Sequence, residues 1–303
     1  MRVLVAGATS VPGLPLLREL GARGHDVVGM TRSSAKTADI AATGARPVVA
    51  DVFDPAQIDA VVADLRPDVV ISLLTTLPKR GPMRVKDFEP ARKLWGSGAA
   101  NLVRAAQRAG VRRVVAESVL FAYGYGSTGP ALIDETDPYP GPPPPGGADM
   151  LNALRGMEQT VLTSGEHSDT EGIVLRYGVF YGPDVPHTKM FTRLVKWWLL
   201  PAVTGSGVVS WIHIDDVVTA TADAVDRGRG GQLYNIVDDR PQSFGDYVRE
   251  MAAGLHRPRP LPISPRVFGL IAPYGAAAFG DTWLPLSNAK AKAELGWTPR
   301  PRV

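Results

Sequence analysis

The first thirteen residues constrain the possible fold of this chain more than any other stretch. Val3 to Ala6 form a continuous apolar run, which is typical of a strand covered on both faces. The run ends at Gly7, and a turn to Gly13 leads into residues 14–20, where apolar side chains recur at helical spacing. Free N–H groups and the positive end of a helix dipole would face this turn, where a pyrophosphate can bind. The stretch predicts a dinucleotide site, although two glycines alone also fit an ordinary strand-to-helix turn.

Apolar runs and helical patterns alternate along the next hundred residues. We expect buried strands at 25–30, 47–50, 68–73 and 111–116. This alternation is typical of an α/β fold, a Rossmann-type doubly wound parallel sheet in which ligands bind beyond the carboxyl ends of the strands. We assign residues 1–180 to this dinucleotide-binding domain, with 208–238 returning to it, and residues 181–303 mainly to a smaller C-terminal substrate-binding lobe.

The end of the second expected strand indicates which dinucleotide binds. It reads Thr31, Arg32 and Ser33, and no carboxylate follows directly. In dinucleotide-binding folds a carboxylate here binds the adenosine ribose, whereas an arginine pairs with a 2'-phosphate. The sequence therefore favours NADP(H), with NAD(H) as the alternative if Arg32 is only a solvated loop residue.

The composition excludes several classes of function. The 303 residues include no cysteine, so disulfides and thiolate chemistry are excluded, and no group of residues has metal-ligand spacing. The net charge of +3 and the scattered basic residues give little support to nucleic-acid binding. No apolar run approaches about 18 residues, and Met1 leads directly into the first strand, so we expect a cytoplasmic protein without a membrane partner. The sequence does not indicate an oligomeric state.

Motifs spread over nearly the whole chain resemble those of one family. Gly7, Ser10 and Gly13 stand where that family has Gly-x-x-Gly-x-x-Gly, with serine in place of the middle glycine. A Tyr-Gly pair at Tyr123 and the segment Trp211–Asp216 match further family motifs. The chain thus resembles the extended, NAD-dependent epimerase/dehydratase-like branch of the short-chain dehydrogenase/reductase superfamily.

The resemblance implies which residues bind the cofactor. The glycine turn would hold the pyrophosphate, the end of the second strand would hold the adenosine, and the ends of later strands would line the rest of the cofactor. The implied cofactor residues are Gly7, Thr9, Ser10, Val11, Gly13, Thr31, Arg32, Ser33, Asp51, Val52, Leu73, Leu74, Thr75 and Tyr177.

The catalytic set of the family is missing from this chain. That set comprises an Asn, a Ser or Thr, and a Tyr-x-x-x-Lys pair whose tyrosine exchanges the carbonyl proton. Counted from neighbouring motifs, these four positions hold Trp95, Val119, Met150 and Leu154. Residues 141–162 contain neither tyrosine nor lysine, so no shift of the alignment restores the pair. Since positioned acid catalysis is worth roughly 10²- to 10⁴-fold, the chain either lacks redox activity or obtains its proton elsewhere.

Three other side chains are candidate catalytic residues. Ser118 lies at the end of the fifth expected strand and can hydrogen-bond a carbonyl. We expect His187 on a loop that faces the cleft, and imidazole titrates near neutral pH. Tyr123 can also reach the cleft. Each has a purely structural interpretation as well, because a buried tyrosine usually packs and satisfies its hydroxyl.

The expected substrate pocket is apolar. Its lining residues are Trp95, Val119, Phe121, Met150 and Met190. Such a lining favours a flat aromatic ligand over a nucleotide sugar, which needs polar and basic contacts. The sequence therefore predicts an NADPH-dependent ketoreductase acting on a polycyclic aromatic ketone that helps to supply the proton. The resemblance to reductases of this superfamily that lack the usual catalytic residues implies an angucyclinone-like ketone and a role in antibiotic biosynthesis. A non-catalytic NADP-binding regulatory protein and a nucleotide-sugar epimerase or dehydratase are the alternatives.

Overall fold

A parallel sheet of seven strands forms the centre of the computed structural model, which describes residues 1–78, 81–127, 129, 131–138, 141–166 and 168–300. The strands are β1 (Arg2–Ala6), β2 (Asp26–Thr31), β3 (Arg46–Val49), β4 (Val69–Ser72), β5 (Arg113–Val119), β6 (Glu171–Tyr177) and β11 (Gln232–Ile236). They lie in the order β11-β6-β5-β4-β1-β2-β3, and every neighbouring pair is parallel. The predicted Rossmann-type α/β fold is confirmed.

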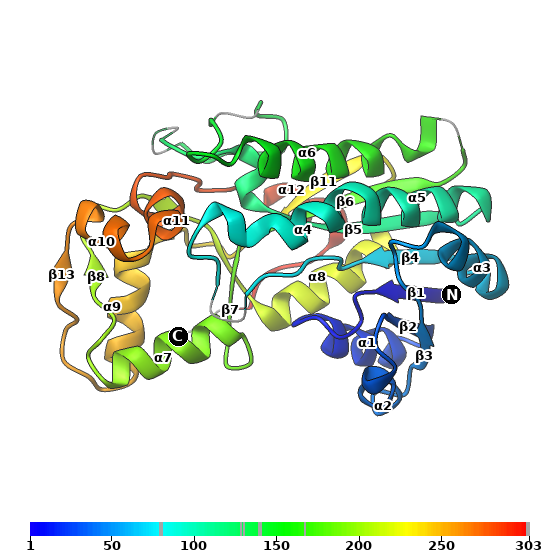
Figure 1. Ribbon diagram of the computed structural model, residues 1–303, viewed down its shortest axis with the longest axis horizontal. Helices are drawn as coiled ribbons and strands as arrows, with labels where there is room; N and C mark the ends of the chain where they lie inside the picture. Colours follow the sequence, from blue (N-terminus) through cyan, green and yellow to red (C-terminus); the bar gives the residue numbers. More distant parts are fainter. Residues whose placement is uncertain (79–80, 128, 130, 139–140, 167, 301–303) are drawn as a thin grey trace.

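Helices cover both faces of this sheet (Figure 1). They are α1 (Gly13–Ala22), α2 (Thr37–Ala41), α3 (Pro55–Leu65), α5 (Ala99–Arg108), α6 (Ala148–Leu162), α8 (Ile214–Arg227) and α12 (Ala289–Leu295). Because side chains alternate across a strand, Leu4 and Ala6 of β1 pack in the cluster that includes α3, α5 and α6, whereas Val3 and Val5 pack with α1 and α8. Among the described residues, no helix has the length and apolar character needed to cross a membrane.

The helical segment before β5 is irregular. After β4 the chain forms a short 3₁₀ turn, η2 (Val85–Phe88), then α4 (Glu89–Lys93) and a π-helical turn, η3 (Leu94–Gly98), before α5 begins. The π turn places the buried Trp95 toward the apolar cluster that includes α6. Single π turns inside helices occur frequently at functional sites.

A smaller lobe lies beside the carboxyl ends of the strands (Figure 1). Its elements are β7 (Val179–Tyr181), α7 (Pro186–Lys196), β8 (Ala202–Val203), β9 (Val208–Val209), β10 (Trp211–His213), β12 (Gln242–Ser243), α9 (Phe244–Gly254), β13 (Pro262–Ile263), α10 (Pro265–Ile271), α11 (Pro273–Gly275) and the π turn η6 (Ala276–Gly280). Trp211 is stacked on Tyr247, with ring centroids 4.1 Å apart, in the core of this lobe. The expectation of a loop around His187 is wrong, because α7 occupies that stretch.

Late segments of the chain complete the dinucleotide half. β11 pairs with β6 at the edge of the central sheet, and α12 contacts both α8 and β11. Trp297 is buried in the same apolar cluster as α1 and α8. The sheet and its covering layer are therefore built from segments that precede, separate and follow the two lobe segments in the sequence.

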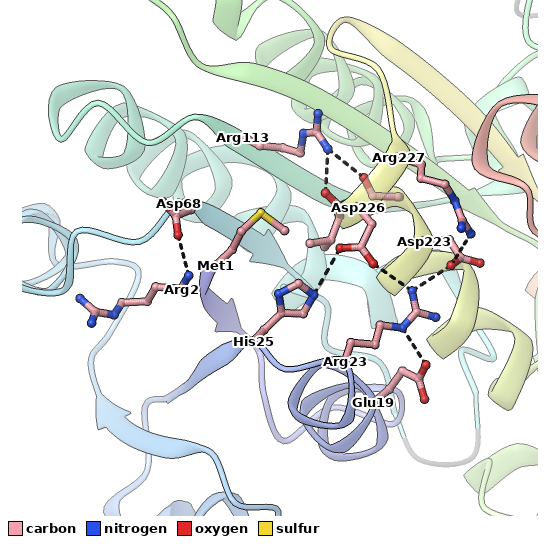
Figure 2. Close-up of polar contacts among 12 residues, drawn as sticks. Met1, Arg2, Glu19, Arg23, His25, Asp68, Arg113, Asp223, Asp226 and Arg227 are labelled. Atoms are coloured by element: carbon pink, nitrogen blue, oxygen red, sulfur yellow. Dashed lines mark hydrogen bonds and ion pairs between the residues drawn. The ribbon is translucent and has the colours of Figure 1, made fainter.

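Ion pairs join α1 to α8 near the amino ends of the strands. Arg23 follows α1 and bonds to Glu19 at 2.8 Å, while its Nη1 reaches Asp223 at 2.8 Å and Asp226 at 3.2 Å (Figure 2). The Nε2 atom of His25 lies 3.3 Å from Asp226. These contacts tie the first helix to a helix 200 residues later, at the end of the sheet away from the lobe.

Candidate active site

The turn between β1 and α1 accepts only glycine at two positions. Gly7 has a φ of +81°, and a Cβ there would lie 2.4 Å from the carbonyl oxygen of Leu73. A Cβ on Gly13 would lie 2.4 Å from the carbonyl oxygen of Ala8. A larger residue at either position would push α1 or β4 away, so the close approach depends on the missing side chains.

The start of α1 has polar groups that fit a pyrophosphate. In the part of the chain that the structure describes, no side chain caps this helix, whose N-cap residue is Pro12. The N–H of Gly13 donates to the carbonyl of Ser10 at 3.1 Å and Pro15 has no N–H, so Leu14 is the donor of this first turn that can bind an anion. The buried Oγ of Ser10 also has no hydrogen-bond partner among the described residues, and Thr9 and Val11 are half-buried beside it. An unpartnered hydroxyl and the N–H of Leu14 at one turn fit the phosphates of a dinucleotide.

Arg32, which the sequence predicts to bind the adenosine end of the cofactor, lies directly after β2, and that contact stays a prediction. Thr31 is buried at the end of β2, Arg32 is exposed, and the N–H of Ser33 donates to Thr31 Oγ1 at 3.3 Å. The next carboxylate in the sequence, Asp39, faces Lys36 at 3.6 Å. Arg32 has no ion pair within the described ranges, so its guanidinium is available to an outside phosphate.

The other predicted cofactor residues lie at the carboxyl ends of their strands. Asp51 Oδ1 accepts the N–H of Phe53 at 3.0 Å, and the carbonyl of Val52 accepts Nδ2 of Asn101 at 2.8 Å, which holds this loop against α5. At the end of β4, Leu73 is buried, and Leu74 and Thr75 are half-buried. Their contact with the cofactor stays a prediction.

Tyr177 is fully buried at the end of β6, where its hydroxyl lies 2.7 Å from Thr221 Oγ1 on α8. Its ring lies 5.5 Å from that of Phe180, centroid to centroid. Burial raises the pKa of Tyr177 well above its usual value. In this arrangement the side chain has no exposed surface, so the predicted contact with the cofactor would require it to move.

Ser118 belongs to a buried ionic network. Its hydroxyl donates to Glu158 Oε1 at 2.5 Å, and Arg176 bonds both oxygens of Glu158 at 2.7 and 2.6 Å. Glu158 and Arg176 are 0% and 3% exposed, so the pair is held away from water. Removing one member of such a pair costs more than the pair itself contributes. The structure therefore gives Ser118 a structural role here, and its predicted catalytic role would require this network to open.

Tyr123 is attached to the same network. The guanidinium carbon of Arg176 lies 4.3 Å from the centre of its ring. The hydroxyl lies 3.0 Å from the carbonyl oxygen of Asp134 and 3.1 Å from Asn235 Oδ1, both of which can accept its proton. Burial raises the pKa of Tyr123 to about 12, so the phenol keeps its proton at neutral pH. The side chain is fully buried, and its catalytic role stays a prediction that this conformation does not favour.

His187 lies in the first turn of α7 and is half-buried. Its Nε2 is 2.7 Å from the carbonyl oxygen of Phe180, which can only accept, so Nε2 carries the proton. Burial lowers the pKa of His187, although the bond to the Phe180 carbonyl acts in the opposite direction. The imidazole is therefore neutral at pH 7 and has only Nδ1 left, as an acceptor.

Four of the five predicted substrate residues meet in one apolar cluster. Trp95 and Met150 belong to its buried part, and Val119 and Phe121 pack against it. Phe121 is stacked on Tyr125, with ring centroids 5.1 Å apart. We call Trp95, Val119, Phe121 and Met150 the apolar wall. The fifth residue, Met190, is half-buried on α7.

The family's tyrosine and lysine positions lie on the same apolar surface. Met150 and Leu154 of α6 are 5% and 2% exposed and pack in the cluster that contains Trp95. Neither side chain can exchange a proton. Within the described ranges, no group of three or more His, Asp or Glu side chains is placed to hold a metal.

A surface hollow of about 760 Å³ lies at the other end of the sheet. It is lined by Leu162, by residues 168–172 and by Gly228–Gly231, which precede β6 and β11. In doubly wound folds the ligand binds at the carboxyl ends of the strands. The glycine turn lies at that end of the sheet, away from the hollow, and a substrate site at the apolar wall stays a prediction.

The family of the chain follows from its match to known sequences. A model described as the NAD dependent epimerase/dehydratase family matches residues 3–237. The chain belongs to this family. The nicotinamide dinucleotide that the sequence predicts is the cofactor in this family's description, and the glycine turn fits it.

Two members named as reductases are similar to the chain. The 3-diazoavenalumate denitrifying reductase of Streptomyces sp is 36% identical over 99% of this chain and 96% of that protein. The 2'-dehydrokanamycin reductase of Streptomyces kanamyceticus is 28% identical over 85% of this chain and 68% of that protein. These relatives support an NAD(P)-dependent oxidoreductase within the epimerase/dehydratase family.

A solved structure supports the fold. The Thermus thermophilus UDP-glucose 4-epimerase in complex with NAD superimposes with a TM-score of 0.79 at 21% identity. The match covers 100% of this chain and 95% of the epimerase chain. Both the central sheet and the lobe of this epimerase/dehydratase family member therefore follow the arrangement of that structure.

Glu117 is a buried acidic residue near the predicted site that the sequence analysis did not single out. It lies near the carboxyl end of β5, 7% exposed, and its Oε2 is enclosed without a hydrogen-bond partner among the described residues. Its register partner in β6 is Leu175, and when ionised its carboxylate raises the pKa of Tyr177 at the end of that strand. Burial raises the pKa of Glu117 to about 8, so the carboxyl keeps its proton at neutral pH. An acidic residue directly after the apolar run Val114–Ala116 was the available signal in the sequence.

Proposed function

We propose that the chain is an NADPH-dependent reductase of a polycyclic aromatic, angucyclinone-like ketone. The reductase relatives support hydride transfer, and the exposed Arg32, which has no ion pair among the described residues, supports NADPH over NADH. The observation that carries the substrate class is the apolar cluster around Trp95, Phe121 and Met150. Phe121 is half-buried and Trp95 and Met150 are each 5% exposed, so these side chains would have to part to admit a flat ring system. A nucleotide sugar would leave its hydroxyl groups without partners on such a wall.

The residues of this chain would position rather than protonate the substrate. When bound, the reduced nicotinamide supplies the hydride. The apolar wall would orient the ring system and exclude water, and correct orientation alone can be worth roughly 7 to 11 kcal/mol of the barrier. A hydroxyl next to the ketone in the same ring system would stabilise the developing alkoxide through an internal hydrogen bond and pass its proton across. This accounts for a site in which Met150 and Leu154 replace the usual acid and lysine.

The first experiment follows the absorbance of NADPH in the presence of a panel of polycyclic ketones and quinones. We expect oxidation of NADPH with ketones that carry a neighbouring phenol or enol hydroxyl. The same ring systems with that hydroxyl methylated should not be reduced. Cofactor binding without turnover on any member of the panel would favour the regulatory alternative instead, and turnover of nucleotide sugars would favour the epimerase alternative.

The second experiment asks whether Glu117 supplies the proton. Glu117→Gln keeps the shape of the side chain and removes the titratable proton. If the substrate assists, this variant should keep the rate within about 10-fold of the unaltered protein, because a general acid is worth roughly 10²-fold or more. Loss of turnover with unchanged cofactor binding would identify Glu117 as the acid and overturn substrate assistance.

A further inference from the structure

One corner of the lobe exposes large apolar side chains to solvent. Trp197, Trp198 and Leu199, which follow α7, are 73%, 67% and 68% exposed. Leu261, which precedes β13, is 73% exposed. Side chains of this size and apolar character are usually covered, and clusters of them mark interaction sites.

The two segments that carry these residues lie side by side. β8 and β13 pair in parallel, and the N–H of Ala202 donates to the carbonyl of Leu261 at 2.9 Å. Figure 1 shows α7 and α9 ending at the same corner of the lobe. From there the segment after α7 continues into β8, and the segment after α9 continues into β13. We call residues 196–199 together with residues 257–261 the tryptophan corner.

The backbone at Trp198 adds an independent observation. Its φ is +60°, a left-handed conformation that favours glycine. The N–H of Trp198 donates to the carbonyl of Val195 and that of Leu199 to the carbonyl of Leu194, so Trp198 holds the position where helices usually place a glycine. An exposed tryptophan at this position gains little from packing inside the chain. Its presence is explained if the side chain packs against something outside the protein.

The charges around the corner are of one sign. Residues 190–209 and 251–280 contain no Asp or Glu. Arg193, Lys196, Arg257 and Arg259, in or next to the corner, are exposed and make no ion pair within the described part of the chain. Arg266, also exposed, belongs to α10, which Figure 1 shows at the opposite end of α9 from the corner. Elsewhere in the lobe, carboxylates pair with cations, as Asp246 does with Arg249 and Glu250 with Arg240.

We propose that the tryptophan corner docks on the surface of an anionic lipid bilayer. Tryptophan and leucine insert at the boundary between headgroups and acyl chains, and adjacent Lys and Arg side chains are attracted by anionic headgroups. Both kinds of residue are present at this corner. The expectation of no membrane partner rested on the lack of a long apolar run, which concerns spanning and not surface attachment. The proposal goes beyond the reductase activity and does not depend on it.

Flotation of the full chain with vesicles tests the proposal. Vesicles of equal parts phosphatidylglycerol and phosphatidylcholine should carry the protein at low ionic strength, and added salt should weaken the binding. Vesicles of phosphatidylcholine alone should carry much less. The double variant Trp197→Ser, Trp198→Gly should lower the partition coefficient by about 10-fold or more. The triple variant Lys196→Glu, Arg257→Glu, Arg259→Glu should have a similar effect on anionic vesicles.

Matched variants elsewhere on the surface serve as controls. Leu132 is 61% exposed, and Arg18 and Arg46 are exposed outside the lobe. Leu132→Ser and the double variant Arg18→Glu, Arg46→Glu should leave vesicle binding unchanged. Three results would overturn the proposal: no flotation of the unaltered protein, equal flotation of the corner variants, or a dimer in sedimentation velocity that the tryptophan variants disperse. Vesicle binding is read without substrate, so its failure is distinct from failure of the reductase proposal.

Discussion

The buried carboxyl of Glu117 makes the stability of this protein depend on pH in a way that one substitution can remove. The pKa of Glu117 is raised by burial from its ordinary value of 4.5 to about 8. Below pH 4.5 the carboxyl is protonated in both the folded and the unfolded chain. Between pH 4.5 and 8 the unfolded chain has lost this proton while the folded chain retains it, so stability falls as the pH rises. Above pH 8 the loss is complete.

The size of the effect follows from the interval between the two pKa values. Each pH unit within it removes about 1.4 kcal/mol from the free energy of unfolding. The whole interval is therefore worth about 5 kcal/mol, of which about 4 kcal/mol falls between about pH 5 and pH 8. This is a large share of the roughly 5–15 kcal/mol that stabilises a typical domain. Glu117→Gln carries no titratable proton at this position and should lack this contribution.

Denaturant unfolding of both proteins at several pH values between about 5 and 8 measures the difference. The amide of Glu117→Gln also lacks a partner for its second donor, which adds a cost that does not change with pH. The informative quantity is therefore the difference in free energy of unfolding between the two proteins as a function of pH. It should shift by about 4 kcal/mol in favour of the variant across this range. Glu166→Gln, at an exposed glutamate, should follow the unaltered protein. Parallel curves for the unaltered protein and Glu117→Gln would refute the reasoning.

Three further predictions follow from the site and the lobe. Arg32→Asp should change the ratio of the NADH and NADPH dissociation constants by about 10-fold or more in favour of NADH, because a carboxylate repels the 2'-phosphate. Equal affinities of the unaltered protein for the two cofactors, measured by fluorescence titration, would contradict this prediction. Ser118→Ala, Tyr123→Phe and His187→Ala should each lower the rate of NADPH oxidation by less than ~10²-fold, and a variant that binds cofactor but has no turnover would identify the missing acid. Trp198→Gly should raise the free energy of unfolding by about 1 kcal/mol, because it relieves the left-handed backbone; a decrease in a denaturant titration would show that the tryptophan packs within the chain.

The fold could be predicted from the sequence because its signals are local. The apolar runs at Val3–Ala6 and Val69–Ser72 each fill a strand that is buried on both faces, and the glycine turn follows directly from Gly7 and Gly13. The π turn at Trp95 could not be predicted, because apolar periodicity does not distinguish a widened turn from a regular helix. The helix α7 was missed because Pro186 and the preceding turn residues read as a loop, although proline also suits a first helical position.

The site was predictable only where it depends on sequence position. The glycine turn follows β1 and Arg32 follows β2, as the sequence predicts. The roles of Ser118 and Tyr123 depend on Glu158 and Arg176, which approach only in the folded chain and bind the serine's hydroxyl. The pKa of Glu117 likewise depends on enclosure by the neighbouring strand and Tyr177. Burial of polar groups is a property of the tertiary structure, so the sequence could name Ser118 and Tyr123 but neither Glu117 nor the protonation of these groups.

The interrupted order of the dinucleotide half limits how this enzyme can be recombined with its relatives. The lobe enters the chain twice, between β6 and α8 and again between β11 and α12. A single crossover at the end of β6 would separate the sheet from β11 and from the layer that contains Trp297. A chimera that exchanges substrate specificity must therefore replace two separate segments and keep residues 214–236 and 289–297 from the same parent as β1 to β6. Directed evolution by one-point shuffling after β6 would produce chains in which β11 and α12 of one parent must pack against the sheet of the other.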